Sequence, residues 1–116
     1  MNIILTTYLG KIQVKPRKYY KVYVVNRIKG KKSYIGETNY ETRTIKIEKG
    51  SYSEMVDTLR HELMHIWLYE LGYKEQNGGC FTYEQVCEMS AMSNEFIFKE
   101  TERFKSILKL FFGKGK

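Results

Sequence analysis

The stretch from Ser51 to Gly72 constrains the fold most, because it has the pattern of one long amphipathic helix. Ser51 and Glu54 have the spacing of a capping box at its start, and Gly72 stands where a left-handed C′ residue would end it. About twenty residues at roughly 1.5 Å each make a helix some 30 Å long, which we expect to be the central one. Its apolar residues recur at three- and four-residue steps: Met55, Val56, Leu59, Leu63, Ile66, Trp67 and Leu71.

Segments before this helix have the residue pattern of β-strands. Tyr20–Val25 is rich in β-branched and aromatic side chains. Thr44–Glu48 alternates polar and apolar residues, as expected of a strand with one buried face. Ile3–Leu5 and Ile12–Val14 would add a short hairpin around Gly10. We therefore expect three or four strands in the first half of the chain.

A second helical region is expected after the central helix. Residues 73–81 are polar and read as a loop, and Thr82–Gln85 forms another capping box. Helical spacing continues to Ile97 and returns over Phe104–Phe112. The sequence thus predicts an α+β fold in one domain over residues 1–116. A small, mostly antiparallel N-terminal sheet packs on the central helix and on a second, C-terminal helix.

The composition agrees with one globular domain. Of the 116 residues 42% are hydrophobic, and 20 Lys and Arg outnumber 13 Asp and Glu, a net charge of +7. The lysines are scattered and form no clear nucleic-acid motif, so we interpret the charge as an aid to solubility. No apolar stretch approaches the roughly 18 residues of a transmembrane helix, and Met1–Leu5 lacks the features of a signal peptide. We expect a cytoplasmic protein in which Cys80 and Cys87 are free thiols.

The predicted central helix carries the only two histidines of the chain, in the order His61, Glu62, Leu63, Met64, His65. Residues four apart lie one turn apart on the same helix face, so two imidazoles can reach one metal ion. Glu62 is rotated by about 100° from His61 and can flank a metal-bound water without binding the metal. The spacing predicts a zinc site with a general base beside it.

A catalytic zinc ion needs a third protein ligand, and no third histidine is present. Glu84 lies 19 residues after His65 at the start of the next predicted helix, and Glu88 follows one turn later. We interpret Glu84 as the third ligand and Glu88 as the carboxylate that orients an imidazole N–H. Three alternatives stay open: the two roles exchanged, a thiolate ligand from Cys80 or Cys87, or both glutamates as solvated helix charges.

This site would hydrolyse peptide bonds. Zinc lowers the pKa of its bound water to about 7, Glu62 takes the proton, and the hydroxide attacks a carbonyl polarised by the metal. Tyr69, Tyr73 and Tyr83 are near enough in sequence to stabilise the oxyanion, but the spacing selects none of them. A protein or peptide substrate would add as a strand along an exposed sheet edge, for which we expect Thr44–Glu48.

The motif from His61 to His65, with Glu84 and Glu88 downstream, resembles the gluzincin pattern. The stretch from Tyr34 to Met92 resembles the minimal HExxH zincin metallopeptidases of phages and mobile elements, near the ImmA/IrrE family. The matching pieces are residues 36–38, 58–65 and 83–88. The resemblance implies a zinc hydrolase with a small sheet beside two zinc-bearing helices, and a regulatory protein such as a repressor as its substrate.

Two other functions are compatible with the sequence. The first is a non-catalytic interaction module with a structural zinc site, since small domains gain stability from a bound metal. A structural site, however, has no use for the general base Glu62. The second is nucleic-acid or membrane contact through the apolar and basic segment Phe104–Phe112, a pattern more typical of a helix that packs on a core.

Overall fold

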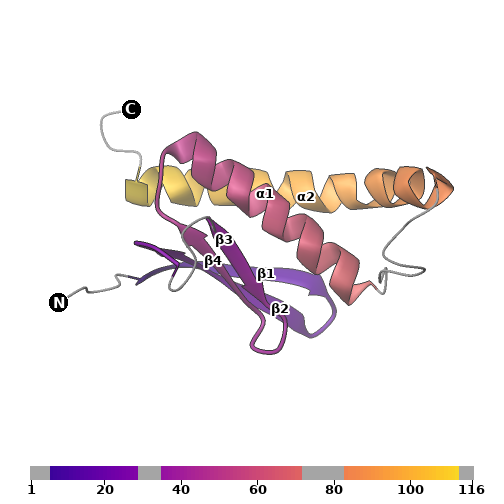
Figure 1. The fold of residues 1–116 in the computed structure, drawn as a ribbon, viewed down its shortest axis with the longest axis horizontal. Coiled ribbons are helices and arrows are strands. Elements are labelled where there is room, and N and C mark those ends of the chain that lie inside the picture. The colour runs from indigo at the N-terminus through magenta and orange to yellow at the C-terminus, as the bar shows by residue number, and fades with distance from the viewer. Residues whose placement is uncertain (1–5, 29–34, 72–82, 113–116) are drawn as a thin grey trace.

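The protein consists of one sheet with both helices on the same face (Figure 1). The computed structural model describes residues 6–28, 35–71 and 83–112. The elements in chain order are β1 (Thr6–Lys15), β2 (Lys18–Val25), β3 (Gly36–Asn39), β4 (Thr44–Glu48), α1 (Tyr52–Glu70) and α2 (Tyr83–Phe112). This α+β arrangement confirms the predicted fold class.

The sheet has the strand order β1-β2-β4-β3. The β1–β2 and β3–β4 pairs are antiparallel, and β2 and β4 pair in parallel. The expectation that Thr44–Glu48 is an edge strand is therefore wrong, because this segment hydrogen-bonds to a strand on each side. Its alternating pattern reports one buried face and carries no information on how many strands lie beside it. Among the described strands, β3 and β1 form the edges.

The predicted hairpin around Gly10 is also wrong, since β1 passes through Gly10 without turning. Gly10 has φ of 143°, and the register with β2 shifts between Tyr8 and Gly10, which marks a β-bulge. A bulge and a turn use the same left-handed freedom of glycine, so the residue type could not separate them. The chain turns instead at Pro16 and Arg17, where Arg17 has φ of 65°. Ile3–Leu5 lies outside the described residues.

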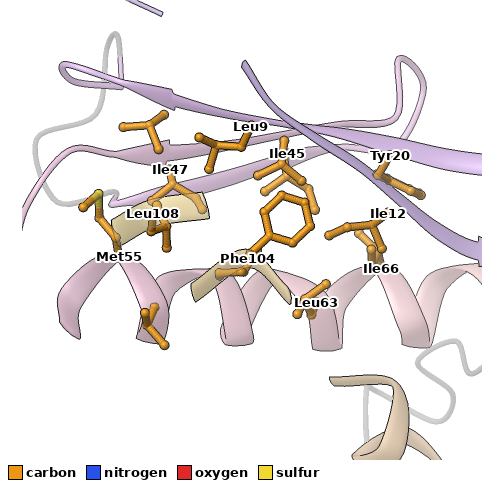
Figure 2. Close-up of a cluster of buried hydrophobic side chains, with 14 residues drawn as sticks. Leu9, Ile12, Tyr20, Ile45, Ile47, Met55, Leu63, Ile66, Phe104 and Leu108 are labelled. Carbon is orange, nitrogen blue, oxygen red and sulfur yellow. The ribbon is translucent and has the colours of Figure 1, made fainter. Parts of the chain in front are cut away.

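A single hydrophobic core fills the space between the sheet and the helices (Figure 2). Alternate residues of the strands enter it, including Ile12, Tyr20 and Ile45, none of which is exposed to solvent. Helix α1 contributes side chains at helical spacing such as Leu59 and Leu63, also fully buried. These contacts fix the rotation of α1 about its axis, and so decide which of its residues face outward.

Helix α1 begins as the sequence predicts. The Ser51 hydroxyl accepts from the Glu54 backbone N–H, and the Glu54 carboxylate accepts from the Ser51 N–H, which completes the capping box. The helix ends at Glu70 with Leu71 as its C-cap residue. The expected role of Gly72 falls outside the described residues.

Helix α2 joins the two helical stretches of the sequence into one element of 30 residues. Phe104 and Leu108 in its C-terminal third are completely buried in the core. The segment Phe104–Phe112 is thus a core-packing helix, as its spacing favours. Neither helix, within the residues described, has the length and apolarity needed to cross a membrane.

Candidate metal centre

The two histidines lie side by side on the solvent-facing surface of α1. Their Nε2 atoms are 3.0 Å apart, and the ring planes meet at 74°. Two nitrogens that bind one zinc ion at about 2.0–2.1 Å in tetrahedral geometry are separated by roughly 3.3 Å. The observed separation is close to that value, and both rings are exposed. The pair therefore fits the two-imidazole part of a zinc site without a change in the backbone.

Glu62 lies beside the histidines and contacts strand β3, and only 6% of it is exposed. The Thr38 hydroxyl donates to Glu62 Oε1 at 2.5 Å. Gly36, two residues earlier on the same strand, permits this contact, because a Cβ there would lie 2.8 Å from Glu62 Oε2. It would also lie 2.5 Å from Thr58 Cγ2 on α1. Strand β3 is thus in direct van der Waals and hydrogen-bond contact with α1 at Glu62, the predicted general base.

An open cleft of about 450 Å³ joins these groups. Both histidines and Glu62 form one wall, from α1, and β3 with the residues next to it forms the other. The lining residues are Ile35, Gly36, Glu37, Thr38, Tyr40, His61, Glu62 and His65. The histidine pair, Glu62 and the outer edge of β3, an edge strand among those described, thus border the same cleft. An extended ligand in the cleft can contact all three.

Tyr40 is a residue of this cleft that the sequence did not single out. Its ring stacks on Tyr69 of α1, with ring centroids 4.1 Å apart and planes at 13°. Burial, and then the charges of Glu62 and Tyr69, raise the pKa of the Tyr40 hydroxyl above its ordinary value. The group stays protonated and can donate a hydrogen bond. Of the tyrosines considered earlier, Tyr69 supports this ring, and Tyr73 lies outside the described residues.

The predicted third ligand is not joined to the histidines in the described part of the chain. Glu84 is exposed in the first turn of α2, and Glu88 is exposed one turn later. Within residues 6–28, 35–71 and 83–112, no three His, Cys, Asp or Glu side chains form a group able to hold a metal ion. Cys87 is an exposed free thiol, and Cys80 lies outside the described residues. The ligand role of Glu84 stays a prediction.

The C-terminal end of α1 is fixed to the sheet through a second buried carboxylate, Glu70. The Tyr20 hydroxyl donates to Glu70 Oε2 at 2.6 Å, and Arg43 Nε lies 3.4 Å from the same oxygen. Lys15 Nζ donates to the Glu70 backbone carbonyl at 2.7 Å. Burial and the Glu70 carboxylate raise the pKa of Tyr20, which keeps its proton in this contact. These bonds anchor the C-terminal end of α1, the helix that carries the histidines, to the sheet.

Comparison of the chain with models of protein families, with curated proteins and with solved structures found no match.

Proposed function

We propose that the protein is a zinc-dependent peptidase whose reaction takes place in the cleft between α1 and β3. The observation that carries the proposal is the arrangement around Glu62. A buried carboxylate faces the same cleft as two imidazoles whose Nε2 atoms are 3.0 Å apart. A structural zinc site has no use for such a base, and this argues against the alternative of a non-catalytic module with a zinc staple.

His61 and His65 would hold the metal, with Glu84 as the expected third ligand. A zinc ion bound there supplies Lewis acidity, which lowers the pKa of water to about 7 and polarises a carbonyl group. Glu62 accepts the proton of the attacking water and later delivers it to the leaving amine. Thr38 holds the Glu62 carboxylate while it does so, and Tyr40 donates to the developing oxyanion.

The substrate would lie along β3. Among the described strands this one is bonded only to β4, and Gly36, Thr38 and Tyr40, on and just after it, line the cleft. An extended peptide can add to such an edge through main-chain hydrogen bonds. Strand β3 thus replaces Thr44–Glu48 as the proposed docking edge. The chemistry is that of a zincin, and cleavage of a regulatory protein by an enzyme near the ImmA/IrrE family stays a prediction.

Zinc content and peptide hydrolysis together test the proposal. We expect about one zinc ion per chain by elemental analysis, with loss of the metal in His61→Ala and in His65→Ala. Glu84→Ala should weaken zinc binding more than Glu88→Ala, and the opposite order would exchange their roles. Hydrolysis of a library of quenched fluorescent peptides should require the metal. A protein that binds no zinc when refolded with it would contradict the proposal.

A further inference from the structure

The two helices leave one face of the sheet uncovered. Both helices pack on one face, and no described element covers the opposite one, which we call the outer sheet face (Figure 1). The strand register places three tyrosines and three lysines there, together with Gln13, Glu37 and Glu48: Tyr8, Tyr19, Tyr23, Lys11, Lys21 and Lys46. Their strand neighbours Leu9, Ile12, Tyr20, Val22, Val24, Ile45 and Ile47 point into the core.

Two of the three tyrosines are exposed, and Tyr23 is half-buried between its neighbours. Tyr8 is 46% exposed and Tyr19 is 47% exposed. Tyr8 lies beside Tyr23, with ring centroids 5.3 Å apart and planes at 51°. Aromatic rings displayed on a flat sheet are a surface on which flat, uncharged ring systems can stack.

Two of the lysines, Lys11 and Lys21, have no acidic residue opposite them, whereas Lys46 lies opposite Glu37 of β3. Lys11 lies directly opposite Lys21 in the β1–β2 pair, an arrangement that is unfavourable unless an anion lies nearby. Lys11 Nζ is 5.6 Å from the centre of the Tyr19 ring. Across the described residues, none of the ion pairs involves Lys11, Lys21 or Lys46. The Lys11–Lys21 pair is therefore arranged to receive an anion.

The positive charge of the chain is concentrated in its first half, as it is on the outer sheet face. Residues 1–50, which include the four described strands, contain 12 Lys and Arg and 3 Glu, whereas residues 51–116 contain 8 Lys and Arg and 10 Asp and Glu. The net charge of +7 is thus the balance of a strongly basic half and a slightly acidic one. Such an asymmetry is typical of proteins that bind polyanions.

We propose that the outer sheet face binds single-stranded nucleic acid. Its phosphates would lie on Lys11 and Lys21, and its bases would stack on Tyr8 and Tyr19. A duplex fits less well, because its bases are already stacked on one another. The strand could extend toward a polar hollow of about 280 Å³ lined by Glu37, Asn39, Thr42, Thr44 and Lys46. This surface lies on the opposite side of the sheet from α1, so the inference does not depend on the peptidase proposal.

Fluorescence anisotropy with the full chain tests the stacking part. The probes are labelled oligo(U) and oligo(dT) of about 12 nucleotides, with a duplex of the same length as competitor. Tyr8→Ala/Tyr19→Ala should weaken binding of the single strands by at least about 30-fold, because two stacking rings are lost, and Tyr8→Phe/Tyr19→Phe should restore it. Phe98→Ala, which removes an exposed ring on α2 (63% exposed), is the matched control and should leave binding unchanged.

Salt dependence tests the phosphate contacts. Lys11→Gln/Lys21→Gln should reduce the slope of log K against log salt by about 1.4, since each phosphate contact on a single strand contributes about 0.7. Lys99→Gln/Lys105→Gln removes the same charge from α2 and should leave the slope nearly unchanged. Circular dichroism confirms that each variant is folded. Duplex or anionic lipid vesicles bound as tightly as the single strands, or equal effects of the two lysine pairs, would overturn the proposal.

Discussion

Two carboxylates on the same helix, Glu62 and Glu70, are equally buried and yet have opposite surroundings. Glu62 is 6% exposed and Glu70 is 7% exposed. Glu70 contacts a tyrosine hydroxyl and two cations, Arg43 and Lys15. Glu62 contacts the neutral hydroxyl of Thr38 and opens onto the cleft beside the histidines. No ion pair involves Glu62 in the described part of the chain.

We interpret the difference as burial that serves stability at Glu70 and, under the proposed function, chemistry at Glu62. A carboxylate near a helix C-terminus is disfavoured by the helix dipole, and the cations around Glu70 offset that effect. Its bonds join the end of α1 to β1, β2 and the turn before β4. Glu62 has no such cation beside it among the described residues, and its carboxylate opens onto the cleft, where the proposed mechanism uses it as a base.

The largest expected difference is in catalysis. Glu62→Gln should lower peptide hydrolysis by about 10³-fold, because the amide cannot take up a proton, while zinc content stays unchanged. Glu70→Gln is the matched variant, since it makes the same change eight residues away on α1. It should keep most of the activity. Single-turnover hydrolysis by the zinc-loaded proteins measures the rate of both variants. Similar losses of rate in the two variants would contradict a catalytic role for Glu62 and a structural role for Glu70.

The free energy of unfolding should be affected more by a change at Glu70 than by one at Glu62. Glu70→Ala leaves the fully buried Tyr20 hydroxyl without its acceptor and Arg43 without its counter-charge, at a cost of about 2–3 kcal/mol. This value is below that of a fully buried pair because the Arg43 side chain is 34% exposed. Glu62→Ala loses only the bond from Thr38 and should cost about 1 kcal/mol. Urea unfolding measures the free energy of unfolding of both variants. A larger loss for Glu62→Ala would show that Glu62, and not Glu70, is the stabilising carboxylate.

Tyr40→Phe tests whether the Tyr40 hydroxyl takes part in the chemistry beside Glu62. The variant keeps the stacking on Tyr69 and loses only the hydroxyl, so stability should change by less than about 1 kcal/mol. The kcat value should fall by roughly 10–100-fold with little change in KM, as expected when a transition-state donor is removed. Tyr69→Phe is the control, because it removes the hydroxyl from the other ring of the pair. An unchanged kcat in Tyr40→Phe would exclude Tyr40 as the oxyanion donor.

Thr38→Val tests whether the Glu62 carboxylate is held in place by its hydrogen bond. Loss of the Thr38 donor should reduce kcat about tenfold with little change in KM, because the carboxylate is no longer held where it can take up the proton. Thr38→Ser restores the hydroxyl and should restore kcat. A Thr38→Val protein that keeps its full kcat would show that this hydrogen bond does not position Glu62.

The smallest expected effect concerns a third carboxylate of α1, the exposed Glu54. Hydrogen bonds from the backbone and side chain of Ser51 lower the pKa of Glu54. A lowered folded-state pKa stabilises the protein above the unfolded value of about 4.3, and this contribution is lost as the pH falls through the folded-state pKa. Ser51→Ala should cost about 1 kcal/mol at pH 7.

At pH 3 the cost of Ser51→Ala should be smaller, because part of the Glu54 charge has then been neutralised in both proteins. Urea unfolding at the two pH values measures the change. Asp57→Ala, on an exposed part of the same helix, should have little effect at either pH. An equal cost of Ser51→Ala at pH 7 and pH 3 would show that the Ser51 hydroxyl does not stabilise the ionised Glu54 carboxylate; the backbone N–H of residue 51, which the variant keeps, still donates to it.

Features that depend on residues near in sequence were predictable. The capping box, the extent of α1 and the histidine pair follow from spacings of three and four residues, which the helix converts directly into geometry. The strand Thr44–Glu48 follows in the same way from its alternation. The general base was predicted as a position on the helix, although its buried contact with Thr38 was not.

Only the tertiary structure decided which segments meet across the chain. The place of β4 inside the sheet, the bulge at Gly10 and the stacking of Tyr40 on Tyr69 depend on partners distant in sequence or on a choice between conformations that glycine permits equally. The same holds for the bond from Thr38 to Glu62, which joins residues 24 positions apart. The physical reason is that a short-range pattern records which face of an element is buried, whereas its neighbours are chosen by the packing of the whole core.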